Sequence, residues 1–436
     1  MKRVMIAAVV SATVALGAFT GCASAAETGA DEASSTSVAL AVADAVAEDT
    51  ADNDAATSQE AAPVTTVSSF EGGVLDTADM FTDRDLTQAA DMSGATTIAL
   101  ASGQDVTISE EGVYVVSGTA ENTTITVDAD SSAKVQIVLD GATITNSDAP
   151  AIYVASADKV FITTAEGSTN ALSTTGEFVA IGEDNVDGVI FASDDVVLNG
   201  MGTLVIESAA NGIAGKDDVK ITGGTYQITA ANHGIEGKDS VAIADGSFTI
   251  TAGKDAIHAE NSDDQTLGYV YIADGAFALT ASSDGIEGDA AVQIDGGTFT
   301  IQAAEGIEGT YVQLNDGVIG IEASDDGINA TSKSSAYSVV LEINGGETTV
   351  VMGAGDTDAL DSNGDLIINS GTVDITAQSA FDFDGRGELN GGTLIVNGEQ
   401  VTELTNSMMG GGMGGQMGGR GGMDGGPMGG APDGML

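Results

Sequence analysis

The sequence predicts an all-β protein whose body is a single right-handed parallel β-helix, with three strands in each coil of about 22 residues. Three observations lead to this fold class. A unit of nearly constant length recurs through most of the chain. Apolar and polar residues alternate inside each unit, and glycine, at 60 of 436 residues, separates the alternating pieces.

The repeated unit reads Asp/Asn-Gly-Ile, then Val-x-Ile, Gly-Gly-Thr-Phe and Ile-x-Ala. Its period-two alternation is typical of strands with one buried face. A perimeter of about 22 residues at about 3.3 Å each accommodates three strands with their turns, and coils stack about 4.8 Å apart. Copies aligned on the residue before the first isoleucine, or on its equivalent, fall at Gly188, Gly212, Gly234, Ala256, Gly285, Gly306, Gly327, Ala359 and Phe381. Two longer intervals indicate insertions at 261–268 and 331–338. Leucine-rich repeats share the period, but their Leu-x-x-Leu-x-Leu frame is absent.

Residues 1–22 have the pattern of a signal peptide. Lys2 and Arg3 precede an apolar stretch, 4–19, that is too short for a membrane span. The stretch ends in Phe-Thr-Gly-Cys, which resembles a bacterial lipobox, so Cys22 is the predicted site of lipidation. The alternative is an ordinary signal peptide with an incidental cysteine. In both cases we expect export, either lipid-anchored to the cell membrane and facing outward or secreted.

The composition divides the remaining chain into three parts. Residues 23–90 predict an acidic, low-complexity linker, and residues 91–403 predict the β-helix. Residues 404–436 are rich in Gly and Met and predict a disordered tail. Thioethers can bind Cu(I), but a flexible tail is the favoured interpretation.

The charge balance favours metal ions as partners and excludes nucleic acid. The chain has 66 acidic and 12 basic residues and a formal net charge of -54. Such a large negative charge repels polyanions. The acidic residues also repel one another in a compact state unless counter-ions are bound. Divalent cations are therefore expected.

Carboxylates recur at two fixed phases of the repeat. Stacking places equivalent residues of adjacent coils about 5 Å apart, where unbridged rows of like charge are unfavourable. Ca²⁺ suits such rows because it accepts six to eight oxygen ligands in loose geometry. The alternative is a solvated acidic edge with raised pKa values. The candidate calcium ligands are Asp255, Asp284, Glu287, Glu305, Glu308, Asp325, Asp326, Asn329, Asp358 and Asp361.

Catalytic candidates are few. Lys216 and Lys238 occupy equivalent places as Gly-Lys-Asp, and a polysaccharide lyase needs such a base beside Ca²⁺. A structural charge pair is the favoured interpretation. His233 and His258, the only two histidines, stand at different phases of the repeat, so no histidine-based mechanism is expected.

The ordered motifs resemble those of the carbohydrate-binding, calcium-containing parallel β-helix family of exported bacterial proteins. The resemblance covers residues 95–400 and rests on Gly-Lys-Asp-Ser-Val (237–241), Gly-Tyr-Val-Tyr-Ile (268–272), Glu-Gly-Ile-Glu-Gly (305–309), Asp-Asp-Gly-Ile-Asn-Ala (325–330), Asp-Ala-Leu-Asp-Ser-Asn-Gly (358–364) and Asn-Gly-Gly-Thr-Leu (390–394). It implies a pectate-lyase-like right-handed β-helix, bound Ca²⁺ among the Asp-Gly-Ile-type acids, and affinity for cellulose or acidic plant polysaccharides without established catalysis.

The sequence therefore predicts a calcium-binding, non-catalytic carbohydrate-binding protein at the cell surface, with cellulose or a polyuronate as its polysaccharide. A net charge of -54 repels polyuronates, so sugar binding is expected to depend on calcium. An adhesin or structural spacer without a glycan ligand is one alternative. A calcium-dependent polysaccharide lyase is the other, since fold alone does not fix function.

Overall fold

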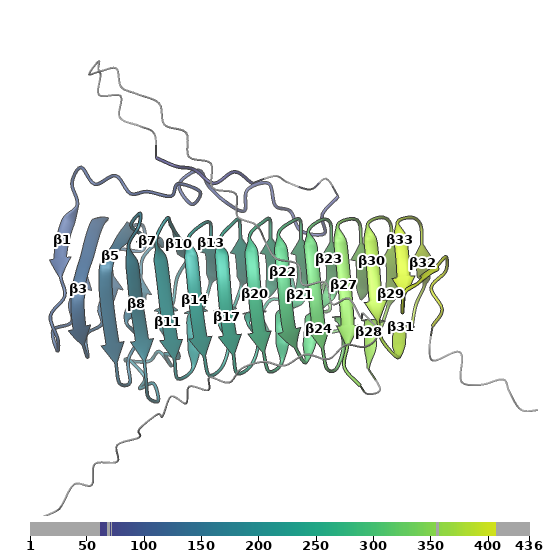
Figure 1. The fold of residues 1–436 in the computed structure, drawn as a ribbon. Helices are drawn as coiled ribbons and strands as arrows, with labels where there is room; N and C mark the ends of the chain where they lie inside the picture. The colour runs from purple at the N-terminus through teal and green to yellow at the C-terminus, as the bar shows by residue number, and fades with distance from the viewer. Residues whose placement is uncertain (1–61, 68–69, 71, 355–356, 407–436) are drawn as a thin grey trace, which may run out of the picture. The chain divides into compact units, whose positions relative to one another are not determined.

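The computed structural model describes residues 62–67, 70, 72–354 and 357–406, and this part of the chain is all-β. Its strands pair almost entirely in parallel, as a long sheet that is consistent with the predicted β-helix (Figure 1). Among the described residues, no helix has the length and apolar character needed to cross a membrane. Of the two compact units, Met1–Gln59 lies outside the described residues, as do Cys22 and the tail from 407, and the second unit is Glu60–Leu436.

Three rows of strands follow from the pairing, and a coil is the chain between one strand of a row and the next strand of that row. The first row comprises β1 (Thr96–Ala99), β3 (Gly112–Glu121), β5 (Lys134–Asn146), β7 (Lys159–Thr164), β10 (Val196–Gly200), β13 (Asp218–Ile221), β16 (Ser240–Ile243), β19 (Tyr269–Ile272), β21 (Asp284–Ile294), β23 (Glu305–Leu314), β26 (Val340–Ile343), β29 (Asp365–Ile368) and β32 (Gly387–Leu389). The second row continues from β3 and β5 through β8 (Thr169–Thr174), β11 (Thr203–Ser208), β14 (Thr225–Ala230), β17 (Ser247–Ala252), β20 (Ala276–Ala281), β22 (Thr298–Ala303), β24 (Val318–Ala323), β27 (Glu347–Met352), β30 (Thr372–Thr376) and β33 (Thr393–Val396), with β34 (Glu399–Val401) antiparallel to β33. The third row comprises β2 (Val106–Ile108), β4 (Ile125–Asp128), β6 (Ile152–Ser156), β9 (Gly188–Ala192), β12 (Asn211–Gly215), β15 (Ile235–Gly237), β18 (Ile257–Ala259), the first parts of β21 and β23, β25 (Ile328–Ala330), β28 (Asp358–Ser362) and β31 (Ser379–Phe383).

The core is one continuous apolar stack between the rows. In β17, Phe248 and Ile250 are buried and Thr249 between them is exposed, as the period-two pattern predicts. The register brings aromatic residues of successive coils face to face. The Phe248 ring lies 4.8 Å from that of Phe277, and Phe277 lies 4.5 Å from Phe299. Equivalent side chains therefore form ladders along the stack, which is the arrangement that also aligns the acids.

The register corrects the predicted alignment at its two ends. Ile190 pairs with Ile213, so Gly188 aligns with Asn211 and not with Gly212. Leu360 pairs with Phe381, so Phe381 is not equivalent to Ala359. Both alignment errors are offsets of one residue. They have the same cause, because matching a motif does not show whether a turn is one residue longer or shorter.

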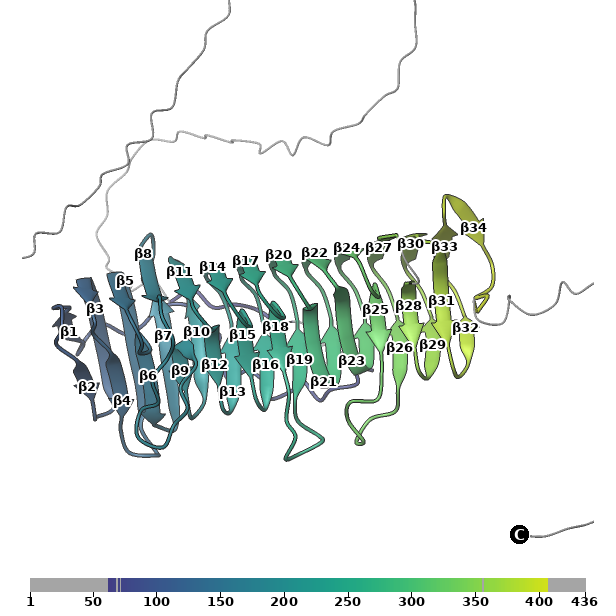
Figure 2. The same cartoon turned by 90° about the horizontal axis from the view of Figure 1, so that it is seen from below.

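The two predicted insertions are loops that precede β19 and β26, and they project from the body (Figure 2). They touch each other, because the Ser334 hydroxyl donates to the Gln265 carbonyl at 2.6 Å and the Ser335 amide donates to the Gln265 side chain at 3.1 Å. The second loop also carries Lys333 toward the third row.

The end of the predicted linker lies against the first row of strands. We call residues 62–67 and 72–90 the strap. An antiparallel bridge between Val64 and Thr87 brings its two ends together. Phe81 packs against Tyr271, with ring centroids 6.2 Å apart, and Leu75 is buried in the same cluster.

Polar contacts fix the strap to coils far away in sequence. The Gln88 side chain donates to the Thr222 carbonyl at 3.0 Å and accepts from the Gly200 amide at 2.9 Å. Gln293 accepts from the Leu75 amide at 2.8 Å. The apolar anchors of the strap have no regular spacing, which is why the sequence pattern did not reveal them. Residues 23–61 of the predicted linker lie outside the described residues.

Candidate metal and glycan site

Two ladders of polar residues run along the third row. The first ladder lies at the corner where each strand of the third row begins and contains Asn211, His233, Asp255, Asp284, Glu305, Asp326, Asp358 and Ser379. The second ladder, three residues later, contains Glu236, His258, Glu287, Glu308, Asn329, Asp361 and Asp382. Between the ladders most coils carry glycine, while alanine, as at Ala256 and Ala359, occupies the position in others. A Cβ on Gly285 would lie 2.3 Å from the Ile301 side chain and 2.5 Å from the Gly306 carbonyl. In the Asp-Gly-Ile-Glu pattern, the glycine and the isoleucine thus pack closely inside the coil, while the two acids point outward and form the ladders.

Three carboxylates in the middle of the ladders form an oxygen-only group, Asp284, Glu305 and Glu308. One oxygen from each lies within 4.8 Å of the others. Asp284 is only 6% exposed and Glu308 only 7%. Burial, followed by the charges of neighbouring acids that include Asp255, raises the pKa of Asp284 to about 8. Burial likewise raises the pKa of Glu308 to about 7 and that of Glu305 above its ordinary value. The group is therefore short of positive charge.

Lys333 supplies part of that charge from the loop before β26. Its ammonium contacts the carboxylates of both Glu287 and Glu308. Burial opposes the lysine charge, but the two hydrogen bonds outweigh it and raise the Lys333 pKa above its ordinary value. Sequence reasoning missed this residue because it lies in an insertion outside the repeat.

The other predicted ligands lie along the continuation of the ladders. Asp325 is exposed and lies outside the close groups of the described residues. Asp326 accepts from the Asp358 amide at 3.1 Å, and Asp358 also contacts the Ser379 hydroxyl. Asp361 lies between Asn329 and Asp382 in the pairing. Burial and three neighbouring acids raise the Asp361 pKa to about 7.

Asn329 adds a neutral oxygen donor next to the oxygen-only group. Its amide nitrogen donates to Glu305 at 3.0 Å and to Glu308 at 3.4 Å. Its Oδ1 atom is buried and makes no hydrogen bond among the described residues. Carboxylates and an amide oxygen are the donor types that Ca²⁺ prefers. The residues present therefore fit the calcium ion that the family resemblance implies.

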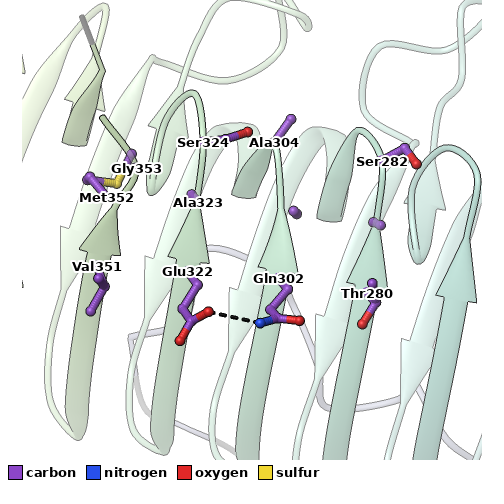
Figure 3. Close-up of a pocket in the computed structure, with 12 residues that line it drawn as sticks. Thr280, Ser282, Gln302, Ala304, Glu322, Ala323, Ser324, Val351, Met352 and Gly353 are labelled. Carbon is purple, nitrogen blue, oxygen red and sulfur yellow. Dashed lines mark hydrogen bonds between the residues drawn. The ribbon is translucent and has the colours of Figure 1, made fainter. Parts of the chain in front are cut away.

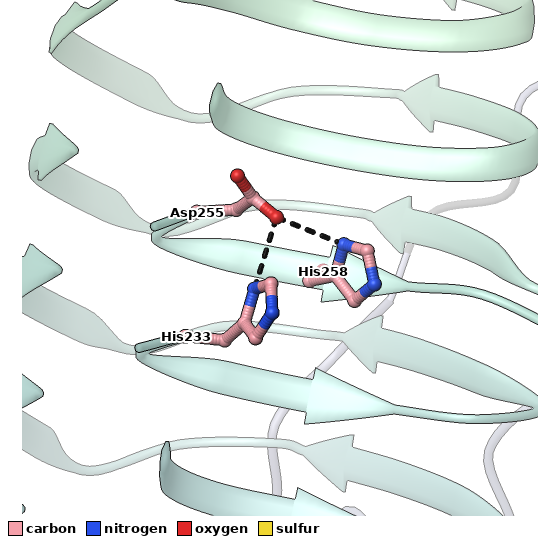
Figure 4. Close-up of side chains that lie close together, drawn as sticks. All are labelled: His233, Asp255 and His258. Carbon is pink, nitrogen blue, oxygen red and sulfur yellow. Dashed lines mark ion pairs between the residues drawn. The ribbon is translucent and has the colours of Figure 1, made fainter. Parts of the chain in front are cut away.

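The two histidines meet next to this group, although the repeat phases predicted otherwise. His233 belongs to the first ladder and His258 to the second, yet their rings stack with centroids 4.3 Å apart. Both Nδ1 atoms face Asp255 Oδ2, at 2.9 Å from His233 and 3.0 Å from His258 (Figure 4). The sequence did contain a signal for this contact. Asp255 and His258 are three residues apart, and at the corner this spacing brings a second-ladder side chain next to a first-ladder one.

An open groove follows the corner on the other side of the acids, at the ends of β20, β22, β24 and β27 (Figure 3). Gln302 donates to Glu322 at 2.8 Å across its floor. Ser282 and Ala304 line it as well. Ala304 directly precedes Glu305, and Ser282 precedes Asp284 by two residues. The groove therefore runs across several coils in the direction of the acid ladders.

The chain is similar to a known protein family, to a bacterial protein and to a solved structure. A family model for carbohydrate-binding domain-containing proteins matches residues 102–357. A protein of that description from Acetivibrio thermocellus is 36% identical over 126 residues, which are 28% of this chain and 44% of that protein, so less than half of that relative is matched. The solved structure of a polysaccharide lyase-like protein from C. thermocellum, a gadolinium derivative, has a TM-score of 0.46 and 32% identity, covering 49% of this chain and 93% of that one. Because the family model spans more than half of the sequence, the chain belongs to the carbohydrate-binding domain-containing family.

Proposed function

We propose that the protein is a calcium-binding, non-catalytic carbohydrate-binding protein at the cell surface, exported and anchored through a lipid on Cys22. The observation that carries the calcium part is the buried, oxygen-only group Asp284, Glu305 and Glu308. Membership of the carbohydrate-binding family supports a polysaccharide ligand. Pairing of every third strand, as in β11, β14 and β17, supports a right-handed β-helix with three strands per coil as the scaffold.

Asp284, Glu305 and Glu308 would hold Ca²⁺, with Asn329 as a neutral oxygen donor. Removing three carboxylates from water is unfavourable unless they are neutralised, and the single ammonium of Lys333 contacts only Glu308 of these three. Calcium would supply the remaining positive charge and a coordination shell large enough to accept oxygen atoms from outside the protein.

The groove beside the corner is the proposed contact surface for the glycan, either cellulose or a polyuronate. It is open, polar along Gln302 and Glu322, and parallel to the acids. A carboxylate-bearing sugar chain would be repelled by this surface unless a divalent cation bridged the two. We therefore propose that binding of acidic glycans requires calcium.

The positions of the basic residues support binding without catalysis. Lys216 lies over the Phe191 ring, 5.4 Å from its centroid, and Lys238 pairs with Asp263 at 2.6 Å. Lys333 contacts the acids but is held in its charged form, in which it cannot accept a proton. A lyase remains an outcome to test, by release of unsaturated product from polygalacturonate with Ca²⁺.

The deciding experiment is a calorimetric titration of the chelator-stripped chain from residue 22, carrying Cys22→Ser, with Ca²⁺ and then with oligogalacturonate in both metal states. We expect saturable calcium sites and sugar binding only with calcium, and co-sedimentation with an insoluble polysaccharide. Glu305→Gln should weaken calcium binding, while Glu347→Gln, the same change on an exposed face of β27, should not. Calcium binding without any sugar binding would identify a spacer or adhesin, and absence of calcium binding would refute the metal proposal.

A further inference from the structure

The histidine pair differs in chemistry from the rest of the ladders. Elsewhere the ladder positions near the middle of the third row carry oxygen donors, whereas His233 and His258 bring two nitrogen donors to one place. These are the only histidines of the chain. His233, Asp255 and His258 offer donor atoms that all lie within 4.8 Å of one another, and Asp255 and His258 are buried.

The carboxylate of Asp255 divides its two oxygens between two tasks. Oδ1 accepts from the Asp284 backbone amide at 3.0 Å, which fixes the orientation of the group. Oδ2 faces both imidazoles. Glu287 Oε2 approaches the same His258 Nδ1 at 2.9 Å, while its other oxygen contacts Lys333. Three donor atoms, two nitrogen and one oxygen, thus converge from two successive coils, and Glu287 reaches the same His258 nitrogen from a third coil.

Hydrogen bonding does not account for all of these contacts. Nδ1 of His233 is buried beside Asp255 Oδ2, yet it makes no hydrogen bond among the described residues. Donor atoms around a tetrahedral ion with bonds of about 2.0–2.1 Å are about 3.3 Å apart. The observed separations of 2.9 and 3.0 Å are shorter by only a few tenths of an ångström. A small outward movement of the two rings would be enough to admit an ion.

We propose that His233, Asp255 and His258, with Glu287 as the fourth donor, bind a divalent transition-metal ion of the zinc class. Imidazole nitrogen with carboxylate oxygen is a donor set that suits Zn²⁺ and its neighbours, whereas Ca²⁺ selects oxygen. With four protein donors the site is closed and structural, joining three coils. Its donor residues differ from those of the proposed calcium site, although the two sites are adjacent: Asp255, Asp284 and Glu287 also lie within 4.8 Å of one another.

The test is a titration with Zn²⁺ in millimolar Ca²⁺, which saturates the other acids. The protein is the full chain from residue 22 with Cys22→Ser and no polyhistidine tag. We expect one saturable equivalent of Zn²⁺. His233→Ala and His258→Ala should each weaken it by about 100-fold or more, since even loss of an outer-shell partner costs 10–100-fold. Glu305→Gln and the exposed control Glu347→Gln should leave it unchanged.

Two further measurements keep the proposal testable if His258→Ala does not fold. Because the chain has two histidines, selective ¹⁵N-histidine labelling gives one pair of nitrogen signals for each ring. Zn²⁺ should shift the Nδ1 signal of both rings in the unmodified chain. Co²⁺ in place of Zn²⁺ should give the visible absorption of a four-coordinate site, and His258→Gln should lose it.

The contrary outcomes are equally definite. Absence of saturable Zn²⁺ binding in excess Ca²⁺ would overturn the proposal. So would equal binding by the His233→Ala/His258→Ala double variant, which would assign the ion to surface acids. A shift confined to one imidazole would show that the two rings form an ion-paired cluster and not a shared site.

Discussion

Of the three close groups of titratable side chains in the described part of the third row, the two outer ones differ in chemistry, and Asp255, Asp284 and Glu287 form the group between them. The mixed group is His233, Asp255 and His258, and the oxygen-only group is Asp284, Glu305 and Glu308. Asp255 and Asp284 are equivalent corner residues, and both are buried. Their pKa values nevertheless move in opposite directions.

The difference arises from the neighbours. Burial acts to raise the Asp255 pKa, but the two adjacent imidazoles and the Asp284 backbone amide outweigh it and hold the pKa well below its ordinary range. Asp284 has acids around it instead, and its pKa rises to about 8. The backbone of the coil therefore fixes the position of a carboxylate. The residues of the neighbouring coil determine the pKa of that carboxylate and the donor atoms beside it, and so the metal ion that fits.

The largest expected effect comes from converting the mixed group into a copy of the oxygen-only group. His233→Asp with His258→Glu removes both nitrogen donors. Zn²⁺ affinity should fall by about 100-fold or more, and calcium stoichiometry should rise by one equivalent, because the donors become oxygen only. Calorimetry with each ion measures both changes. Unchanged calcium stoichiometry would show that donor type alone does not distinguish the two groups.

The reciprocal change acts on the oxygen-only group. Asp284→Asn with Glu305→Gln keeps shape but removes two charges, and calcium affinity should fall by about 100-fold, since ligand charge tunes calcium binding. Zn²⁺ binding by the mixed group should persist. Glu347→Gln serves as the matched control. If both metals are lost together, the two groups are one site.

Removing Lys333 tests how the oxygen-only group is neutralised. Lys333→Met should destabilise the metal-free protein by about 1–3 kcal/mol, less than for a fully buried pair because the side chain is 24% exposed. Saturating Ca²⁺ should shrink the loss, since the ion supplies the missing charge. Chemical unfolding with and without chelator gives both values. Lys254→Met, at an exposed lysine, is the control, and an equal loss in both metal states would contradict the expectation.

The stability of the metal-free protein should depend on pH, because its buried acids are short of neighbouring positive charge. The pKa values of Asp284, at about 8, and of Asp361 and Glu308, at about 7, are raised by folding. Such groups stabilise the fold at low pH, and this stability is lost as pH rises through the raised pKa values. The thermal midpoint should therefore fall by a few degrees between pH 5 and 8, and Ca²⁺ should reverse the fall. A midpoint that rises over this range would contradict the argument.

Regular features of the molecule could be predicted from the sequence, and irregular ones could not. The alternation around Phe248 and the spacing of Asp284 and Glu305 follow from one repeated coil, so the strands and the acid ladders were predictable. His233 and His258 stand at different phases of the repeat, so their contact did not follow from the period, because the turn brings side chains three residues apart onto one corner. Lys333 enters from an insertion, which has no period from which to infer its position.

The strap has a mechanical consequence. The bridge between Val64 and Thr87 and the bond from the Thr65 hydroxyl to the Thr222 carbonyl lie where the described chain begins. Tension applied ahead of residue 62 meets these contacts before it reaches β1. Because these contacts join the strap to the coils around β10 and β13, such a load reaches the middle of the first row before it reaches β1 at its end.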